Sequence, residues 1–192
     1  MNRKPWELES KSVNIHHAVI ERCRKGDRKA QYELYQLYNK AMFNTARRMT
    51  NDDDDAEDVL QESFISAFQN LDQYRGDSAF GAWLKRIVIN KALNHLKKRQ
   101  KWTEMTEAEG VEEPYYEWAS IPDHSMTVKG IKEAIEGLPP GFKMVMNLYL
   151  FEGYDHKEIA QILGVTESTS KSQFNRAKKR VRMFLNTEVK YG

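Results

Sequence analysis

Cysteine and long apolar runs are nearly absent from this sequence. Cys23 is the only cysteine among the 192 residues, so an internal disulfide and a cysteine cluster for zinc are excluded. No apolar run approaches the roughly 18 residues of a membrane-spanning helix. The first residues, MNRKPWELESKS, also lack the apolar stretch of a signal peptide. We therefore expect a cytoplasmic protein with no direct membrane insertion.

A large excess of one charge is likewise missing, but the two signs are kept apart along the chain. The sequence has 30 lysines and arginines against 28 aspartates and glutamates, a formal net charge of +2. Residues 52–62 carry only acidic charge and residues 85–101 only basic charge. An acidic stretch at 104–123 and a basic one at 171–182 repeat this order, without a matching sequence repeat. Two separate basic surfaces would let one chain bind two sites on a nucleic acid.

Apolar residues recur at helical spacing through the first half of the chain. The spacing predicts two helices between Ile15 and Met49, separated by the KGD break at residues 25–27. Two further helices follow, with buried stripes formed by Leu60, Phe64, Ala67, Phe68 and Leu71, and by Phe80, Trp83, Leu84, Ile87 and Val88.

This periodicity fails between Gln100 and Thr127, where two prolines, a glycine and many acids accumulate. Such a segment is extended, or becomes ordered only on a partner. Helical spacing returns after it. We therefore predict an all-α fold of two small helical domains, residues 1–99 and 128–192, joined by a flexible acidic linker at 100–127.

The end of the second domain predicts a helix-turn-helix. Asp155 and Glu158 have the spacing of a capping box, Gly164 ends the first helix in a tight turn, and Thr166 can cap the second. At 100° per residue, the apolar side of the second helix consists of Phe174, Ala177, Val181, Phe184 and Leu185.

Small polar and basic residues point the opposite way from that apolar side, with Lys171 at its edge. This candidate DNA-reading set is Ser168, Lys171, Ser172, Asn175, Arg176 and Lys179. In helix-turn-helix proteins such a face enters the major groove of DNA. An ordinary helical hairpin with a solvated basic face is the alternative.

Three segments, in the same order and with the same gap, resemble the sigma-70 family of RNA polymerase sigma factors, in its small extracytoplasmic-function group. DAEDVLQESFISAF resembles the polymerase-binding segment and YRGDSAFGAWLKRIVINKALNHL the −10 promoter segment. LPPGFKMVMNLYLFEGYDHKEIAQILGVTESTSKSQFNRAKKRV resembles the −35-binding helix-turn-helix. The resemblance implies a bacterial protein that binds core RNA polymerase, recognises a promoter and opens it, with no catalysis and no cofactor of its own.

Several further expectations follow from this resemblance. An anti-sigma factor is an expected partner, and it could hold the protein at the inner membrane. The acidic linker resembles the segment that threads the active-site channel of the polymerase. Ser170 departs from the family pattern, because valine is common at this buried position. Its hydroxyl could bond back one turn, which would leave the recognition helix slightly less firmly seated.

The −10 contacts are expected in the fourth helix. Asn90 and Asn94 lie one turn apart and can offer paired donors and acceptors to an unstacked base, while nearby lysines hold the DNA backbone. The resemblance assigns Asn90 to a pocket for a flipped-out base, lined by the loop from Arg75 to Phe80. Trp83 lies on the apolar stripe, so core packing is favoured over a stacking role. The candidate −10 set is Asn90, Lys91, Asn94, Lys97 and Lys98.

The third helix begins with Asp52 to Asp55. These acids complement the positive end of the helix dipole, so we expect part of the run to cap the helix. Further along, its buried stripe leaves an exposed isoleucine among acidic and polar residues, which indicates a contact surface, although lone surface isoleucines are common. The resemblance identifies the partner as the clamp helices of the largest polymerase subunit. The candidate docking set is Asp58, Gln61, Glu62, Ile65 and Gln69.

Three other functions are less consistent with the sequence. A stand-alone helix-turn-helix regulator would need a ligand or phospho-acceptor domain, which the first half does not indicate. A metal-dependent nuclease built on Asp52 to Asp55 would need a different spacing and a nearby histidine, and the five histidines are better explained by solvent or capping positions. An anti-sigma factor or adaptor would lack the DNA-reading face. Calcium or magnesium should therefore bind only weakly.

Overall fold

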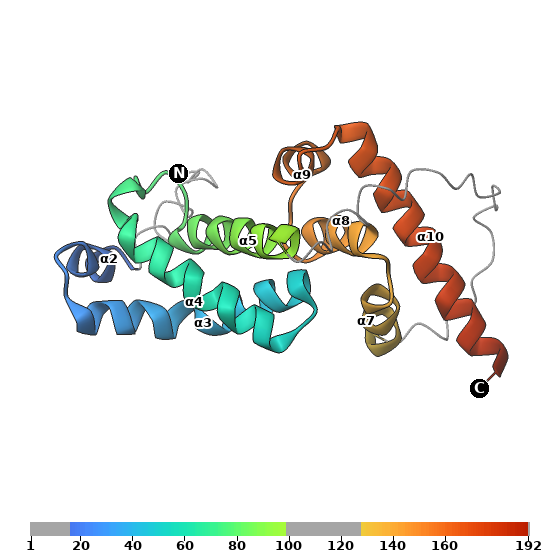
Figure 1. The fold of residues 1–192 in the computed structure, drawn as a ribbon, viewed down its shortest axis with the longest axis horizontal. Coiled ribbons are helices and arrows are strands. Elements are labelled where there is room, and N and C mark those ends of the chain that lie inside the picture. Colours follow the sequence, from blue (N-terminus) through green and yellow to red (C-terminus); the bar gives the residue numbers. More distant parts are fainter. Residues whose placement is uncertain (1–15, 99–127, 192) are drawn as a thin grey trace, which may run out of the picture. The chain divides into compact units, whose positions relative to one another are not determined.

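The structure is a computed structural model, and it describes residues 16–98 and 128–191, with side chains of the last helix as far as Leu185. Within these ranges, every regular element is a helix (Figure 1). The chain divides into two compact units, residues 1–95 and 96–192. These findings confirm the predicted all-α fold with two helical parts. The proposed boundaries at 99 and 128 stay predictions, and the linker at 100–127 lies outside the described residues.

The first unit contains four α-helices and a short 3-10 helix among its described residues. They are α2 (His17–Arg24), α3 (Arg28–Thr50), α4 (Asp53–Gln69), η1 (Leu71–Gln73) and α5 (Phe80–Lys98), the last of which crosses the division between the units. The predicted break at KGD separates α2 from α3. Gly26 has a φ of 80° there, and the Asp27 carboxylate accepts from the N–H of Lys29 and of Ala30, which caps α3.

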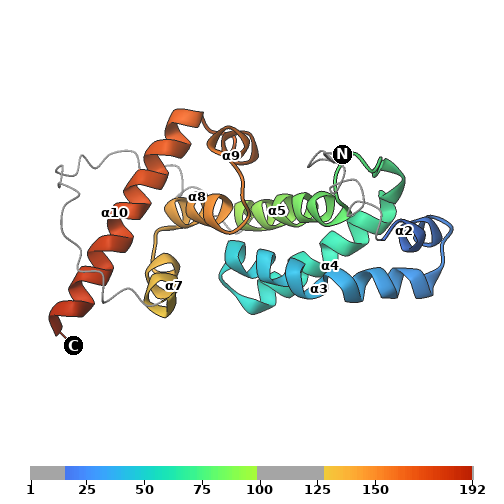
Figure 2. The same cartoon turned by 180° about the vertical axis from the view of Figure 1, so that it is seen from behind.

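The core of this unit forms where α3, α4 and α5 turn their apolar stripes inward. Figures 1 and 2 show α3 and α4 side by side, with α2 packed on α3. α5 runs antiparallel to α4, since Asp55 near the start of α4 meets His95 late in α5, whereas Glu62 meets Lys91. The fully enclosed side chains in this part include Leu34, Val59, Leu84, Val88 and Ile89.

Three of the four aspartates at the start of α4 have different structural roles. Asp52 is the N-cap, and its carboxylate accepts from the N–H of Asp55 at 2.9 Å. Asp53 forms an ion pair with Arg47 of α3. Asp55 is buried, and its Oδ1 lies 3.1 Å from Nε2 of His95. The capping role is confirmed, but the expectation that no histidine lies near these acids is wrong, because packing brings α5 against the first turn of α4.

The second unit consists of four helices in the described residues: α7 (Val128–Glu136), α8 (Pro140–Leu150), α9 (His156–Leu163) and α10 (Glu167–Tyr191). The LPPG segment at residues 138–141 leads into α8, which begins at Pro140, where the missing N–H of proline costs nothing. α10 packs against the other three helices. The centre of this core contains Val145, Leu148, Ile159 and Ala177.

The cap at Asp52 yields a test of the aspartate run. Asp52→Ala should lower the free energy of unfolding by about 0.5–2 kcal/mol, because the N–H of Asp55 loses its acceptor. Asp54 is an exposed acid in the first turn, so Asp54→Ala should lose at most about 1 kcal/mol of helix-dipole interaction. Urea unfolding followed by circular dichroism measures both. Equal losses would show that Asp52 acts only through its charge.

Candidate nucleic-acid interface

Local hydrogen bonds fix the helix-turn-helix of α9 and α10. The Asp155 carboxylate accepts from the N–H of Glu158 at 2.8 Å, and the Glu158 carboxylate accepts from the N–H of Asp155 at 2.9 Å. Gly164 follows α9 with a φ of 72°, a conformation that glycine adopts without strain. Thr166 then accepts from the N–H of Thr169 at 3.0 Å. The predicted capping box, glycine turn and second cap are therefore all confirmed.

The apolar side of α10 lies against the rest of the unit, as the spacing predicted for four of its five residues. Phe174, Ala177, Val181 and Leu185 are buried. Phe184 was expected with them, but it is 41% exposed. Its position, three residues after Val181, places it about 60° away from that residue around the helix axis, at the edge of the buried stripe.

The opposite side of α10 carries the candidate −35 set. Ser168, Lys171, Ser172 and Asn175 are exposed, whereas Arg176 and Lys179 are half-buried. Lys171 Nζ lies 2.6 Å from the carboxylate of Glu167, which lowers the pKa of that acid. The Ser172 hydroxyl donates to the carbonyl of Thr169 at 3.0 Å. The six residues thus share one side, with its most accessible part toward the start of the helix.

Ser170 lies on the buried side of α10, as predicted, but its side-chain partner differs from the expectation. Its Oγ lies 3.0 Å from Nδ1 of His156, in place of the predicted bond to a carbonyl one turn back. His156 was expected at a solvent or capping position. It is half-buried and stacks on Tyr149 of α8, because α8 and α10 enclose the start of α9.

The candidate −10 set extends along the second half of α5. Asn90, Asn94, Lys97 and Lys98 are exposed, and Lys91 is half-buried. The Nζ atom of Lys91 lies 3.5 Å from the carboxylate of Glu62 on α4. The structure therefore brings a residue of the −10 set into contact with a residue of the docking set.

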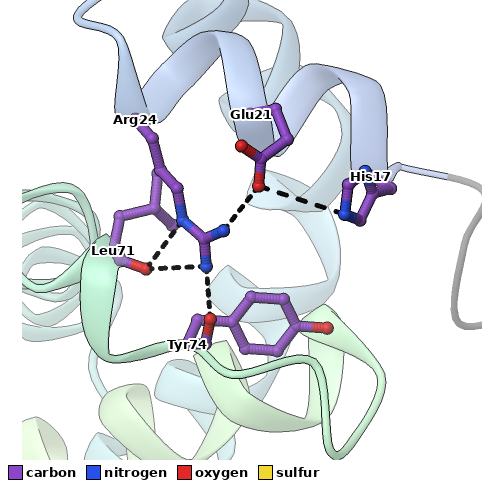
Figure 3. Close-up of polar contacts among 5 residues, drawn as sticks. All are labelled: His17, Glu21, Arg24, Leu71 and Tyr74. Carbon is purple, nitrogen blue, oxygen red and sulfur yellow. Dashed lines mark hydrogen bonds and ion pairs between the residues drawn. The ribbon is translucent and has the colours of Figure 1, made fainter.

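The loop expected to line a base pocket runs from Arg75 to Phe80. Residues 75–79 are exposed, whereas Phe80 is buried and begins α5, and the loop is anchored at both ends. At its start, the Arg24 guanidinium donates to the carbonyls of Leu71, at 3.4 Å, and of Tyr74 (Figure 3). At its end, the Tyr74 hydroxyl donates to the carbonyl of Ser78 at 2.6 Å. Sequence reasoning missed Arg24 and Tyr74, because nothing in a helical repeat indicates which loop a distant arginine reaches.

Aromatic rings close the base of this loop. Trp83 packs against Tyr74 and Phe80, each with ring centroids 5.4 Å apart. Tyr38 of α3 meets Phe80 at 5.3 Å. Trp83 is half-buried in this cluster, which supports the predicted packing role over a stacking role on DNA.

The outer face of α4 is as exposed as its spacing predicted. Val59, Leu60, Phe64 and Ala67 are buried. Ile65 is 57% exposed and lies among the acidic and polar side chains of this face. The other four members of the docking set are also exposed: Asp58, Gln61, Glu62 and Gln69.

Other kinds of site find little support in the part of the chain that the structure describes. In residues 16–98 and 128–191, no three His, Cys, Asp or Glu side chains gather as metal ligands would. None of the helices described is both long and apolar enough to cross a membrane. Cys23 is buried, and burial raises the pKa of its thiol, which disfavours the reactive thiolate.

Comparison with known sequences identifies both units. The profile of Sigma-70 region 2 matches residues 34–102, and that of Sigma-70, region 4, matches residues 129–181. The ECF RNA polymerase sigma-E factor of Salmonella typhimurium (strain LT2) is 32% identical over 173 residues, covering 85% of this chain and 90% of the relative. The chain belongs to the extracytoplasmic-function group of the sigma-70 family. Its function is promoter-specific transcription initiation with RNA polymerase, and a stand-alone regulator is not favoured.

Other members of the family match over the same share of the chain. The sigma-E factor of Escherichia coli (strain K12) is 31% identical and the RNA polymerase sigma-H factor of Pseudomonas aeruginosa 30%, each covering 85% of this sigma factor and 90% of the relative.

Two solved structures share the fold, and one of them is of a sigma factor. CnrH, in complex with the cytosolic domain of CnrY, has a TM-score of 0.53 at 21% identity, covering 88% of this chain and 96% of that one. RpoE from Bartonella quintana, in complex with the anti-sigma factor NepR, has a TM-score of 0.55 at 24% identity, covering 81% and 96%.

Proposed function

We propose that this sigma factor docks on the clamp helices of the largest polymerase subunit through α4, contacts the −10 element through α5 and the −35 element through α10, and helps to melt the DNA. It works in the cytoplasm, catalyses no reaction itself and needs no cofactor. One observation carries the proposal. Burial of the apolar stripes leaves an acidic face on α4 but polar and basic faces on α5 and α10.

The face of α4 fits a protein partner. Ile65 offers an exposed apolar centre, and Asp58 and Glu62 place negative charge beside it. An interface of this composition buries the apolar group and uses the charges to guide encounter with a basic partner. The same acids repel DNA phosphates, so α4 binds polymerase and not DNA, while α5 binds the promoter.

The exposed side of α5 fits an unstacked strand. Asn90 and Asn94 lie one turn apart and offer amide donors and acceptors that can pair with a base edge. Lys97 and Lys98 continue the same helix and attract the DNA backbone. The anchored loop at residues 75–79 supplies a firm wall for a base pocket beside Phe80.

The exposed side of α10 fits the major groove. Ser168 and Ser172 are small enough to allow close approach, Asn175 can read an adenine edge, and Lys171 attracts phosphates or a guanine. Two DNA-binding units on one chain increase avidity, so neither unit needs to bind strongly alone.

An anti-sigma factor is the remaining proposed partner. It would hold the protein inactive by covering the polymerase-binding surfaces, and a membrane-bound form would place the complex at the inner membrane. The structure of similar fold in which the sigma factor RpoE is bound to the anti-sigma factor NepR supports the proposal of such a partner.

The docking face predicts a selective loss of polymerase binding. The double variant Glu62→Lys/Ile65→Ala should bind core polymerase at least about tenfold more weakly, because it reverses one guiding charge and removes the apolar centre. Helical content and Tm should stay nearly unchanged, since both side chains are exposed. Fluorescence anisotropy of the labelled protein against core polymerase measures the affinity.

Two matched controls define the face. Leu37→Ala truncates an exposed leucine on α3, and Asp72→Lys reverses an exposed acid outside α4. Both should bind core polymerase as the parent does. Parent-like affinity in a well-folded Glu62→Lys/Ile65→Ala protein would place the docking surface elsewhere.

The −35 face predicts two separable kinds of loss. Arg176→Ala and Lys171→Ala should each weaken holoenzyme binding to promoter DNA. The loss of a base contact should cost about 1–3 kcal/mol of binding free energy. The loss of a phosphate contact should make the binding constant depend less steeply on salt concentration. Lys132→Ala on the exposed face of α7 is the control for loss of a positive charge. Affinity is measured across a salt series. If both α10 variants matched the control, α10 would not be the reading helix.

A further inference from the structure

Three helices meet around one imidazole at the base of the helix-turn-helix. His156, the first residue of α9, stacks on Tyr149 of α8 with ring centroids 4.8 Å apart and an interplanar angle of 20°. The same ring meets Phe174 of α10 at 5.5 Å in an edge-on arrangement. Its Nδ1 lies 3.0 Å from the Oγ of Ser170, also on α10.

The hydroxyl of Ser170 depends on this contact. The residue is 0% exposed, so water cannot reach its side chain. A buried hydroxyl without a partner is destabilising, and the Nδ1 of His156 provides that partner. The interface between α9 and α10 therefore contains a hydrogen bond, which depends on direction. An apolar residue in place of Ser170 would make only a non-directional packing contact.

We propose that the His156–Ser170 pair positions α10 for promoter reading. A hydrogen bond restricts both distance and angle, so it fixes the rotation and the height of α10 against α9 more narrowly than apolar contact does. Lys171 adjoins Ser170, and Ser168 and Ser172 lie two residues away on either side. Any change in the position of Ser170 relative to α9 thus also moves the exposed side of α10. This inference rests on the proposed contact between α10 and the −35 element.

The surroundings of His156 make this seating depend on pH. Burial, followed by the positive charge of Lys171, lowers the pKa of the imidazole below its usual 6.5. The charged groups that face it are Glu167, Lys171 and Lys178 of α10 and Asp155 at the start of α9, while α8 presents the ring of Tyr149.

The sign of the pH effect follows from linkage. A histidine whose pKa is lower in the folded state contributes stability that is fully present above the unfolded value of 6.5. This contribution is lost as the pH falls through the lower folded value. The packing of His156 between α8 and α10 is therefore most stable at neutral pH and becomes less stable in mildly acidic solution.

A double-variant cycle tests the pair. Ser170→Ala removes the hydroxyl, whereas His156→Phe keeps a ring for stacking on Tyr149 and removes Nδ1. The full-length proteins are bound to core RNA polymerase, and the probe is a fluorescent promoter duplex from a start site that depends on the parent protein. Each single variant should bind about fivefold or more weakly, because either the buried hydroxyl of Ser170 or the half-buried imidazole of His156 loses its partner. The double variant should bind no worse than the weaker single variant. Additive losses, or parent-like binding by Ser170→Ala, would overturn the proposal.

A matched control separates positioning from general destabilisation. Ser63 is also 0% exposed, and its hydroxyl donates to the carbonyl of Val59 at 2.6 Å within α4. Ser63→Ala should lower Tm but preserve the discrimination between the promoter duplex and one with a single base pair changed in the −35 element. Ser170→Ala should reduce that discrimination. An equal reduction in both variants would overturn the proposal.

The pH profile provides an independent readout. Between about pH 7.5 and pH 5.5, around the ordinary histidine pKa, the Tm of the parent should fall further than that of the His156→Phe/Ser170→Ala double variant. If Tm changed with pH in the same way in both proteins, the proposed role of the pair would be contradicted.

Failure of the proposed function gives a different pattern from failure of this inference. If Arg176→Ala weakens promoter binding while the cycle shows no coupling between His156 and Ser170, the inference alone is wrong. If the cycle shows coupling in promoter binding while Arg176→Ala and Lys171→Ala have no effect, the pair stands and the assignment of the −35 contacts is wrong.

Discussion

Burial of a single apolar stripe along each helix is the constraint on which the rest of this structure depends. Once Val59, Phe64 and Ala67 of α4 enter the core, the acidic side of that helix has to face outward. The same holds for α10, where burial of Phe174, Ala177 and Val181 turns the small polar and basic side chains to solvent. Packing therefore sets the positions of the proposed binding faces, and the opposite charges of those faces are the basis for assigning polymerase to α4 and DNA to α5 and α10 in the proposed function.

Polar contacts between helices join these faces to the core. The Nε2 atom of His95 on α5 lies 3.1 Å from the carboxylate of the buried Asp55, and Lys91 of α5 forms an ion pair with Glu62 on the proposed docking face of α4. Arg24 holds the carbonyls at the start of the exposed loop before α5 (Figure 3). Hydrogen bonds and ion pairs restrict geometry more than apolar contacts do, so such contacts suit places where a reading helix or loop has to keep one orientation.

Local rules were enough to predict most of the fold and the surfaces. The break at Gly26, the cap at Asp52, the capping box at Asp155 and the turn at Gly164 each depend on a few neighbouring residues, and all were found as expected. The pairing of His156 with Ser170 and of His95 with Asp55 could not be predicted, because helical spacing does not give the register of one helix against another. Phe184 was misplaced for a related reason, since a residue at the edge of a stripe is buried only if a neighbouring helix reaches it.

The central claim is that one chain brings core polymerase to promoters by reading two DNA elements. Its most direct test is in vitro transcription with purified core RNA polymerase and a pool of genomic fragments, followed by sequencing of the RNA 5′ ends. The account predicts discrete start sites that require the protein and that share two conserved upstream elements at a fixed spacing. Start sites that are the same with and without the protein would contradict it.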